Sequence, residues 1–219
     1  KIPVVICKTY DIPAFVGKHT LFIASSFSGG TEETLIALGQ VREAKIACVT
    51  SGGELLNICK QNNYDYVQIP NEAPCPRAFL GYSFIQILFL LKNYGLINNS
   101  FEAELEKAVK ALDEKKDLIH LEAKRLADIF HGELPIIYSD TRLLATVTRF
   151  QQQINENAKQ LCHINHMPEM NHNELVGWQL GEDAYKNTAV LLVKTAYDNP
   201  RTRLRMDICE EIFLRKTPN

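Results

Sequence analysis

A run of hydroxyl and glycine residues at positions 26–34 has the composition of a phosphate-binding loop. It reads Ser-Phe-Ser-Gly-Gly-Thr-Glu-Glu-Thr, follows an apolar segment and precedes a segment with helical periodicity. Backbone N–H groups and the positive end of a helix dipole converge at such a place and favour an anion. The run lacks the lysine of a nucleotide P-loop and the spacing of a dinucleotide fingerprint. We therefore expect Ser26, Ser28 and Thr31 to hold a small monophosphate.

An ordinary helix cap explains part of the same pattern. Ser28 or Thr31 would then accept a hydrogen bond from the first helical turn, and Glu32 and Glu33 would complement the helix dipole. Capping explains one hydroxyl but not three, and the local spacing leaves both interpretations open.

The elements that must position this loop alternate between strand and helix. Apolar segments of strand length occur in the first half at residues 19–24, 45–50 and 64–69. The segment at 31–43 is helical by pattern, and a second helix is expected to run through residue 59. Strand, loop and helix repeated at this spacing predict a parallel α/β sheet.

The pattern begins again in the second half. Strands are expected at 134–138, 161–167 and 189–196, with helices at 141–159 and 201–215. We therefore predict two three-layer α/β/α halves, over residues 1–97 and 133–219, joined by a helical connector over residues 98–132.

The overall composition limits the functional classes. The chain has 24 basic and 26 acidic residues and a formal net charge of -2, which argues against a general nucleic-acid binder. Its six cysteines form no C-x-x-C pair, which predicts reduced thiols and a cytoplasmic location. The longest apolar run, residues 78–91, is shorter than the roughly 20 residues of a membrane span, so no membrane partner is expected.

Several segments resemble one family of sugar isomerases. The run at 26–34 resembles the phosphate-binding motif of SIS domains, and Ser51-Gly52-Gly53-Glu54-Leu55 resembles the second loop of that fold. Pro76-Arg77-Ala78 resembles a segment of the bifunctional phosphoglucose/phosphomannose isomerases. Two later segments are similar to that family's C-terminal-half signatures: Gln-Ile-Asn-Glu-Asn-Ala-Lys at 153–159 and Pro-Glu-Met-Asn-His-Asn-Glu-Leu-Val-Gly-Trp at 168–178. The resemblance implies two SIS-like halves with parallel sheets.

Two parts of the family pattern have no counterpart in this sequence. The family has an earlier strand that ends in a glycine-rich turn with a phosphate-binding serine, and nothing before Lys1 supplies it. The family also has a C-terminal segment with a catalytic lysine and a substrate-contacting threonine, which would follow Asn219. We therefore expect the second half to be truncated and part of the active site to be missing.

The resemblance implies the reversible isomerisation of glucose 6-phosphate and fructose 6-phosphate, with mannose 6-phosphate as a second aldose. A proton would move between C1 and C2 through an enediolate, by protein groups alone and without a cofactor. Glu156 would be the base, Arg77 would stabilise the enediolate oxygens and His172 would assist ring opening. In the family the matching histidine comes from the neighbouring subunit, which implies a homodimer with shared active sites.

Each of these residues also has a simpler interpretation. Glu156 would be a solvent-exposed residue of a polar helix, Arg77 would start a helix and His172 would belong to a turn. The alternative function is then a non-catalytic SIS module that binds a sugar phosphate as a regulatory ligand.

A metal-dependent isomerase or hydrolase is a third class. Three histidines and two glutamates occur within residues 163–174. If residues 161–167 form a strand, His163 and His166 point to opposite faces and cannot bind one metal together, whereas in a helix they share a face. Pro168 argues against a continuous helix here, and we expect no metal site.

Overall fold

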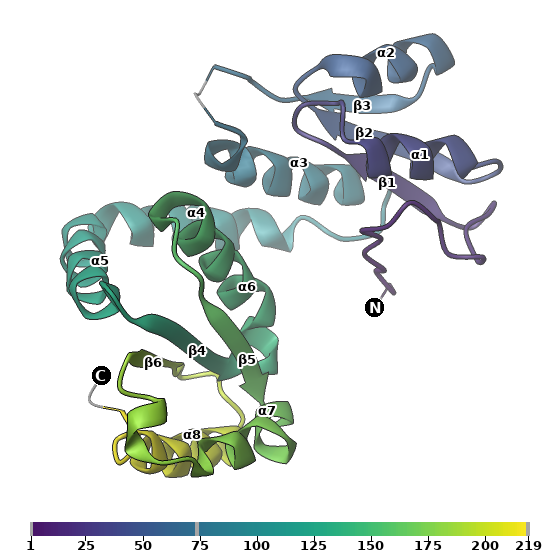
Figure 1. The fold of residues 1–219 in the computed structure, drawn as a ribbon. Helices are drawn as coiled ribbons and strands as arrows, with labels where there is room; N and C mark the ends of the chain where they lie inside the picture. Colours follow the sequence, from purple (N-terminus) through teal and green to yellow (C-terminus); the bar gives the residue numbers. More distant parts are fainter. Residues whose placement is uncertain (1, 73–74, 218–219) are drawn as a thin grey trace. The chain divides into compact units, whose positions relative to one another are not determined.

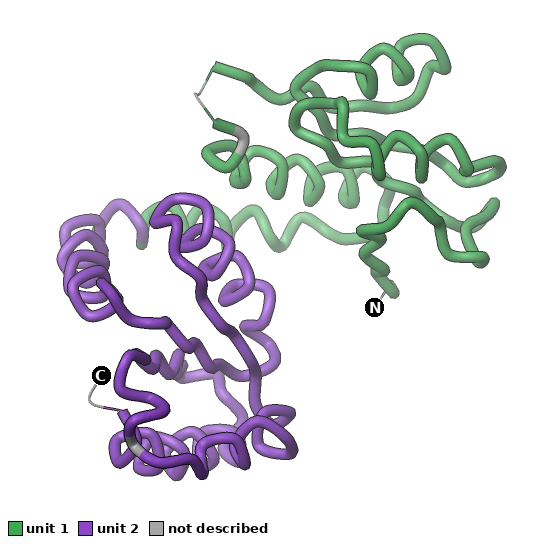
Figure 2. The backbone as a smooth tube through the Cα atoms, in the orientation of Figure 1, with its two compact units in different colours: residues 1–111 green, residues 112–219 purple. Residues whose placement is uncertain are grey.

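The computed structural model describes residues 2–72 and 75–217 and divides into two compact α/β units (Figures 1 and 2). Unit 1 runs from Lys1 to Ala111 and unit 2 from Leu112 to Asn219. Each unit holds one three-stranded parallel sheet, which confirms the α/β class with parallel sheets predicted from the sequence. Within the described residues, no helix is both long enough and apolar enough to cross a membrane.

The sheet of unit 1 has the strand order β1-β2-β3. β1 (Leu21–Ser25) pairs with β2 (Lys45–Thr50), which pairs on its other side with β3 (Asp65–Gln68). The crossovers are α1 (Glu32–Gln40) and α2 (Gly53–Asn62). Each of these elements overlaps the segment in which the sequence predicts it, because the apolar runs are short and are separated by glycine-containing loops.

Further helices follow β3. They are η1 (Pro76–Phe79), a 3-10 turn, and then α3 (Leu80–Asn93), α4 (Ser100–Glu114) and α5 (Lys116–Phe130). The predicted helical connector is therefore two helices rather than one, since the backbone leaves helical geometry at Lys115 (φ -103, ψ 7).

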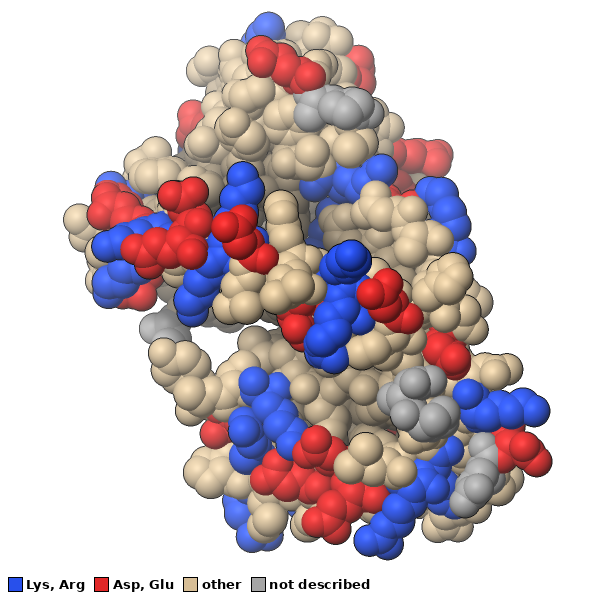
Figure 3. Space-filling view, turned by 90° about the vertical axis from the view of Figure 1, so that its left-hand side faces the viewer, with Lys and Arg blue, Asp and Glu red and all other residues tan. Residues whose placement is uncertain are grey.

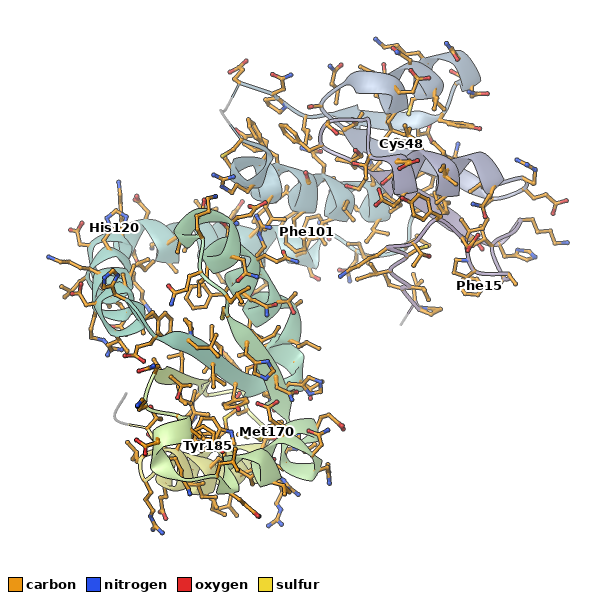
Figure 4. All side chains as sticks on the ribbon, in the orientation of Figure 1. Phe15, Cys48, Phe101, His120, Met170 and Tyr185 are labelled. Carbon is orange, nitrogen blue, oxygen red and sulfur yellow. The ribbon has the colours of Figure 1, made fainter. Side chains whose placement is uncertain are left out.

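Alternate residues of β2 face opposite helical layers. Cys48 packs with Leu55 of α2 on one face of the sheet. Ala47 packs with Leu90 of α3 on the other face. Because neighbouring strand residues point to opposite sides, one apolar strand serves both layers. Figure 4 shows Cys48 inside unit 1, between the strands and the helices.

The sheet of unit 2 has the strand order β5-β4-β6. β4 (Leu134–Asp140) lies in the centre, between β5 (His163–Met167) and β6 (Thr188–Val193). In this register Ile136 lies between His163 and Val190. Because β5 and β6 lie on opposite sides of β4, the chain between them must cross over the central strand.

After α5, the described part of unit 2 contains three more α-helices and several short turns. The helices are α6 (Leu144–Gln153), α7 (Glu169–His172) and α8 (Pro200–Phe213). The short turns are η2 (Thr141–Leu143), η3 (Ile154–Ala158), η4 (Glu174–Gln179) and η5 (Glu182–Ala184). The helix predicted over residues 141–159 is thus interrupted: it begins as the 3-10 turn η2 and ends as the π-helical turn η3.

The core of unit 2 also has two faces. Ile137 packs with Phe130 of α5 and Val147 of α6, whereas Tyr138 packs with Met170 and Phe213. Figure 4 shows Met170 on the side of the sheet where α8 lies. Because Phe130 belongs to this core, α5 packs with unit 2.

All six cysteines are free thiols in the structure, and four of them are buried: Cys48, Cys59, Cys162 and Cys209. Burial raises the pKa of each of these four thiols. They are therefore neutral at neutral pH, and neutral thiols are poor nucleophiles.

On the face shown in Figure 3, basic and acidic side chains lie intermixed.

Candidate active site

The loop between β1 and α1 brings two of the predicted phosphate-binding hydroxyls together. The Oγ atom of Ser26 lies 2.7 Å from the Oγ1 atom of Thr31. Gly29 donates its backbone N–H to Ser26 Oγ at 3.1 Å, and Gly30 donates to Ser28 Oγ at 3.2 Å. Ser26 is buried, whereas Ser28 and Thr31 are exposed. The loop therefore has a buried base and an exposed rim of hydroxyl groups.

The helix-cap interpretation does not describe Thr31. Thr31 occupies the N-cap position of α1, yet its side chain makes no capping hydrogen bond to the helix. The hydroxyl is turned toward Ser26 instead. The first turn of a helix carries backbone N–H groups that need partners outside the helix, and an anion is a suitable one.

The loop at residues 51–53, the second glycine loop, fixes the position of the first glycine loop at residues 26–31. Ser51 donates its backbone N–H and its hydroxyl to Phe27 O, at 2.9 and 2.6 Å. Gly29 and Gly53 both have positive φ, +69° and +66°. A Cβ atom on Gly29 would lie 1.8 Å from Gly52 O, and one on Gly53 would lie 2.2 Å from Ser28 O. Both positions therefore require glycine.

Arg77 lies in η1, on an element that packs beside this loop. The ring of Phe79 in η1 is buried and its centroid lies 5.0 Å from that of Phe27. The side chain of Arg77 itself is exposed. The contact between the two rings places η1 next to residues 26–31, all within unit 1.

Glu156 lies in the π-helical turn η3, which coincides with most of the segment 153–159. Ile154 is buried and anchors the turn, while Lys159 has left-handed backbone geometry (φ 58) and ends it. The amide of Gln160 donates to Phe130 O at 2.8 Å, which ties the end of the turn to the body of unit 2. The side chain of Glu156 is exposed. Single π-helical turns occur often at functional sites.

His172 ends α7, directly after the carboxyl end of β5, and its side chain is exposed. The turn that carries Glu156 precedes the amino end of the same strand, as the path from α6 through β5 to α7 shows in Figure 1. A strand of five residues spans about 16 Å. Within one chain, the structure therefore does not bring the elements that carry Glu156 and His172 together.

The histidine-rich segment forms a strand, β5, as one of the two sequence interpretations required. His163 and His166 lie on opposite faces of it. His163 Nε2 lies 3.0 Å from Glu174, and His166 Nδ1 lies 3.1 Å from Thr141 Oγ1. Across the described parts of the chain, no group of three or more His, Cys, Asp or Glu side chains is arranged to hold a metal ion.

Sequence reasoning missed a polar cluster centred on Glu174. Its carboxylate accepts hydrogen bonds from Tyr138 and Asn165 and faces His163. Burial raises the pKa of the Glu174 carboxyl, but the hydrogen bonds from Asn165, Tyr138 and His163 outweigh burial and hold it below its ordinary value. Trp178 donates its Nε1–H to Tyr138 Oη at 3.1 Å. Glu174 and Trp178 both lie in the segment 168–178. The resemblance of this segment to a family signature was the signal from which the cluster could have been found.

Comparison with solved structures identifies the class of fold. The glucosamine-6-phosphate deaminase of Thermotoga maritima aligns with a TM-score of 0.65 at 15% identity, over 94% of this chain and 61% of that one. Residues 119–218 match the model of the bacterial phospho-glucose isomerase C-terminal SIS domain. The fold is thus an α/β fold of the SIS class.

Comparison with curated proteins shows which enzymes the chain resembles. The chain is 36% identical over 97% of its length to the bifunctional phosphoglucose/phosphomannose isomerase of Caldicellulosiruptor bescii. It is 33% identical over 96% of its length to the enzyme of the same name from Aquifex aeolicus. The chain is thus similar, over nearly its whole length, to bifunctional phosphoglucose/phosphomannose isomerases, and it spans 65% and 64% of the length of these two relatives.

Proposed function

We propose that the protein is a cytoplasmic isomerase that interconverts glucose 6-phosphate and fructose 6-phosphate, and also mannose 6-phosphate and fructose 6-phosphate. The observation that carries the proposal is the loop at residues 26–31: Ser26 and Thr31 face each other there, and α1 begins without a side-chain cap. Such a loop suits the phosphate group of a monophosphate. The reaction class is that of the named relatives.

The proposed chemistry is proton transfer without a cofactor. Glu156 takes the proton from C2 of the open-chain aldose and later delivers a proton to C1, while O1 gains a proton and O2 loses one. Arg77 stabilises the negative charge of the enediolate oxygens, because a guanidinium keeps its charge in a closed site. His172 transfers a proton to the ring oxygen when the sugar ring opens.

We propose further that two copies of the chain share their active sites. The elements that carry Glu156 and His172 lie at opposite ends of β5, so the His172 of one copy is assigned to the Glu156 of another. Full-length Glu156→Gln and His172→Ala variants, each with only residual activity alone, are mixed and allowed to exchange subunits. Activity should recover to about a quarter of wild type, because half of the dimers are mixed and each has one intact site. No recovery after verified exchange contradicts the shared site.

The loop itself is tested by a double variant, Ser26→Ala with Thr31→Val, in the full-length polypeptide. Binding of fructose 6-phosphate, measured by calorimetry, should weaken about tenfold or more, because two hydroxyl partners are lost. Ser100→Ala, at the exposed start of α4, is the matched control and should bind as wild type does. Unchanged affinity in the double variant would show that the loop holds no phosphate.

Coupled assays with fructose 6-phosphate and mannose 6-phosphate test the reaction class. Turnover of both substrates supports the bifunctional isomerase. Tight binding of a sugar phosphate without turnover in the full-length polypeptide would instead support a regulatory SIS module.

A further inference from the structure

The segment that carries His172 is anchored on both sides of that residue. On its N-terminal side, Met170 is fully buried and packs in the same cluster as Met206. On its C-terminal side, Glu174 is half-buried against the sheet. His172 lies two residues from each anchor, and its own side chain is exposed.

Glu174 is held by side chains from two neighbouring strands. Tyr138 of β4 donates its hydroxyl to the carboxylate, and Asn165 of β5 donates its amide to the other oxygen. His163 Nε2 lies 3.0 Å from both carboxylate oxygens. Hydrogen bonds to a charged acceptor are roughly twice as strong as neutral ones. The carboxylate therefore has one well-defined position on the face of the sheet.

Tyr138 links a second residue of the same segment to this point. Its hydroxyl accepts the Nε1–H of Trp178 at 3.1 Å, and the Trp178 ring lies 4.7 Å from the ring of Tyr185. One hydroxyl from the central strand thus binds two residues on the C-terminal side of His172, Glu174 and Trp178.

Asn173 fixes the turn between His172 and Glu174. Its Oδ1 accepts the backbone N–H of Glu174 at 2.6 Å, and its Nδ2 donates to Glu169 Oε1 at 2.8 Å. Together with the carboxylate, these bonds determine the backbone path on the C-terminal side of the histidine.

From these contacts we propose that Glu174, held by Tyr138, is the positioning residue that sets the orientation of His172 during ring opening. The inference rests on the proposed function, since it requires His172 to act on the sugar ring. Stability alone does not require a charge at this position, because well-packed apolar side chains often stabilise a core as well as a buried charged network does. A carboxylate that fixes one backbone geometry suits a residue whose direction matters.

The first test compares Glu174→Gln with wild type in the full-length polypeptide. The amide keeps the shape but loses the charge that three groups bind. We expect kcat for fructose 6-phosphate to fall about 10- to 100-fold, with KM within about threefold, because a small misplacement of a catalytic group is costly. In a His172→Ala background the same change should lower kcat no further. Glu210→Gln on α8, which removes an exposed partner of Lys194, is the matched control and should leave kcat unchanged.

The second test observes the His172 imidazole directly by NMR. The ring signals of wild type should report one preferred orientation, and in Glu174→Gln their chemical shifts should move toward the average of several rapidly exchanging orientations. A variant with kcat within about twofold of wild type and unchanged His172 ring chemical shifts overturns the proposal.

Two outcomes separate this inference from the proposed function. If His172→Ala retains turnover, the role of His172 in the reaction is wrong, whereas the NMR comparison still decides whether Glu174 orients the ring. If Glu174→Gln does not fold, Tyr138→Phe serves instead, because it removes one hydroxyl from the cluster and keeps the ring. Tyr138→Phe should lower kcat more than it changes KM, and an unchanged kcat would count against the proposal.

Discussion

The two sheets end in loops of opposite character at the edge where their parallel strands finish. In unit 1, β1 and β2 are followed by residues 26–31 and 51–53, which carry hydroxyls and glycines and no charged side chain. In unit 2, the end of β4 and the residues after it carry charged side chains that bind each other. Asp140 accepts hydrogen bonds from the N–H and Nε of Arg142, at 2.9 and 3.2 Å. Arg142 also donates to Tyr197 O, in the loop after β6.

The difference shows that one fold can use the same edge in two ways. Ligands of parallel α/β sheets bind outside the carboxyl ends of the strands. In unit 1 this edge of the sheet offers backbone donors and hydroxyls. In unit 2 the side chains of Arg142 and Asp140 occupy it. Function therefore follows from the loop and not from the sheet.

The largest expected effect separates binding from chemistry. Glu156 belongs to unit 2 and is not part of the phosphate loop of unit 1, so Glu156→Gln should lower kcat by about 10² to 10⁴ while KM for fructose 6-phosphate changes little. Steady-state kinetics of the full-length polypeptide measure both constants. A variant with nearly normal turnover would remove Glu156 from the proposed chemistry.

The next effect tests whether the two glycine loops of unit 1 act as one structure. Gly29→Ala places a Cβ atom 1.8 Å from Gly52 O at a φ of +69°. We expect unit 1 to lose about 2 kcal/mol or more of stability and the site to lose sugar-phosphate binding. Amide hydrogen exchange of unit 1 and calorimetry measure the two effects.

The matched control is Gly39→Ala in α1, where nothing lies within 4 Å of the added Cβ atom. It should be neutral or should stabilise the unit by up to about 1 kcal/mol, because alanine favours a helix. If Gly29→Ala and Gly39→Ala change stability and sugar-phosphate binding equally, the contact between the two glycine loops does not hold them together.

A smaller effect is expected at the charged edge of unit 2. Asp140→Asn weakens the bonds to Arg142 and should lower the free energy of unfolding of unit 2 by about 1–3 kcal/mol. Trp178, the only tryptophan of the chain, is buried in unit 2, so its fluorescence reports the transition. Asp207→Asn, at a half-exposed ion pair with Lys194, is the matched control and should leave the free energy of unfolding nearly unchanged. Weaker binding of fructose 6-phosphate in Asp140→Asn would mean that this edge also takes part in ligand binding.

The smallest effect is a dependence on pH. The hydrogen bond from the Arg142 N–H, aided by the Arg142 side chain, holds the pKa of Asp140 below its ordinary value. A carboxyl with a lowered folded-state pKa stabilises the protein above its unfolded pKa of about 3.9, and that stability is lost as the pH falls further. Wild type should therefore lose more stability than Asp140→Asn below about pH 4. A constant difference between them from pH 7 to pH 3 would contradict the lowered pKa.

Local patterns predicted the elements of unit 1 well. The strand at 45–50 has the bounds that its apolar run indicated, and the hydroxyl and glycine loop lies between strand and helix as expected. Both signals depend on neighbours in the sequence. The choice between a helix cap and a phosphate-binding role for Thr31 was left open, because the sequence does not show the direction of a hydroxyl in the folded loop.

Features that depend on contacts between residues far apart in the sequence could not be predicted from local patterns. Glu174 is held by Tyr138, which lies 36 positions earlier, and no local pattern connects them. The π-helical turn at 154–158 interrupts a periodic segment without glycine or proline. The break at Lys115 likewise has no helix-breaking residue beside it, so periodicity alone predicted a continuous helical connector.

The mutual contact of the two glycine loops has a consequence for the speed of binding. Gly29 and Gly53 each occupy a space bounded by the backbone of the other loop, so neither loop can swing outward alone. The phosphate group would meet a site that is already formed, and no ordering step would follow the encounter. In a stopped-flow experiment the observed rate constant should then rise linearly with ligand concentration, with a single phase at all concentrations.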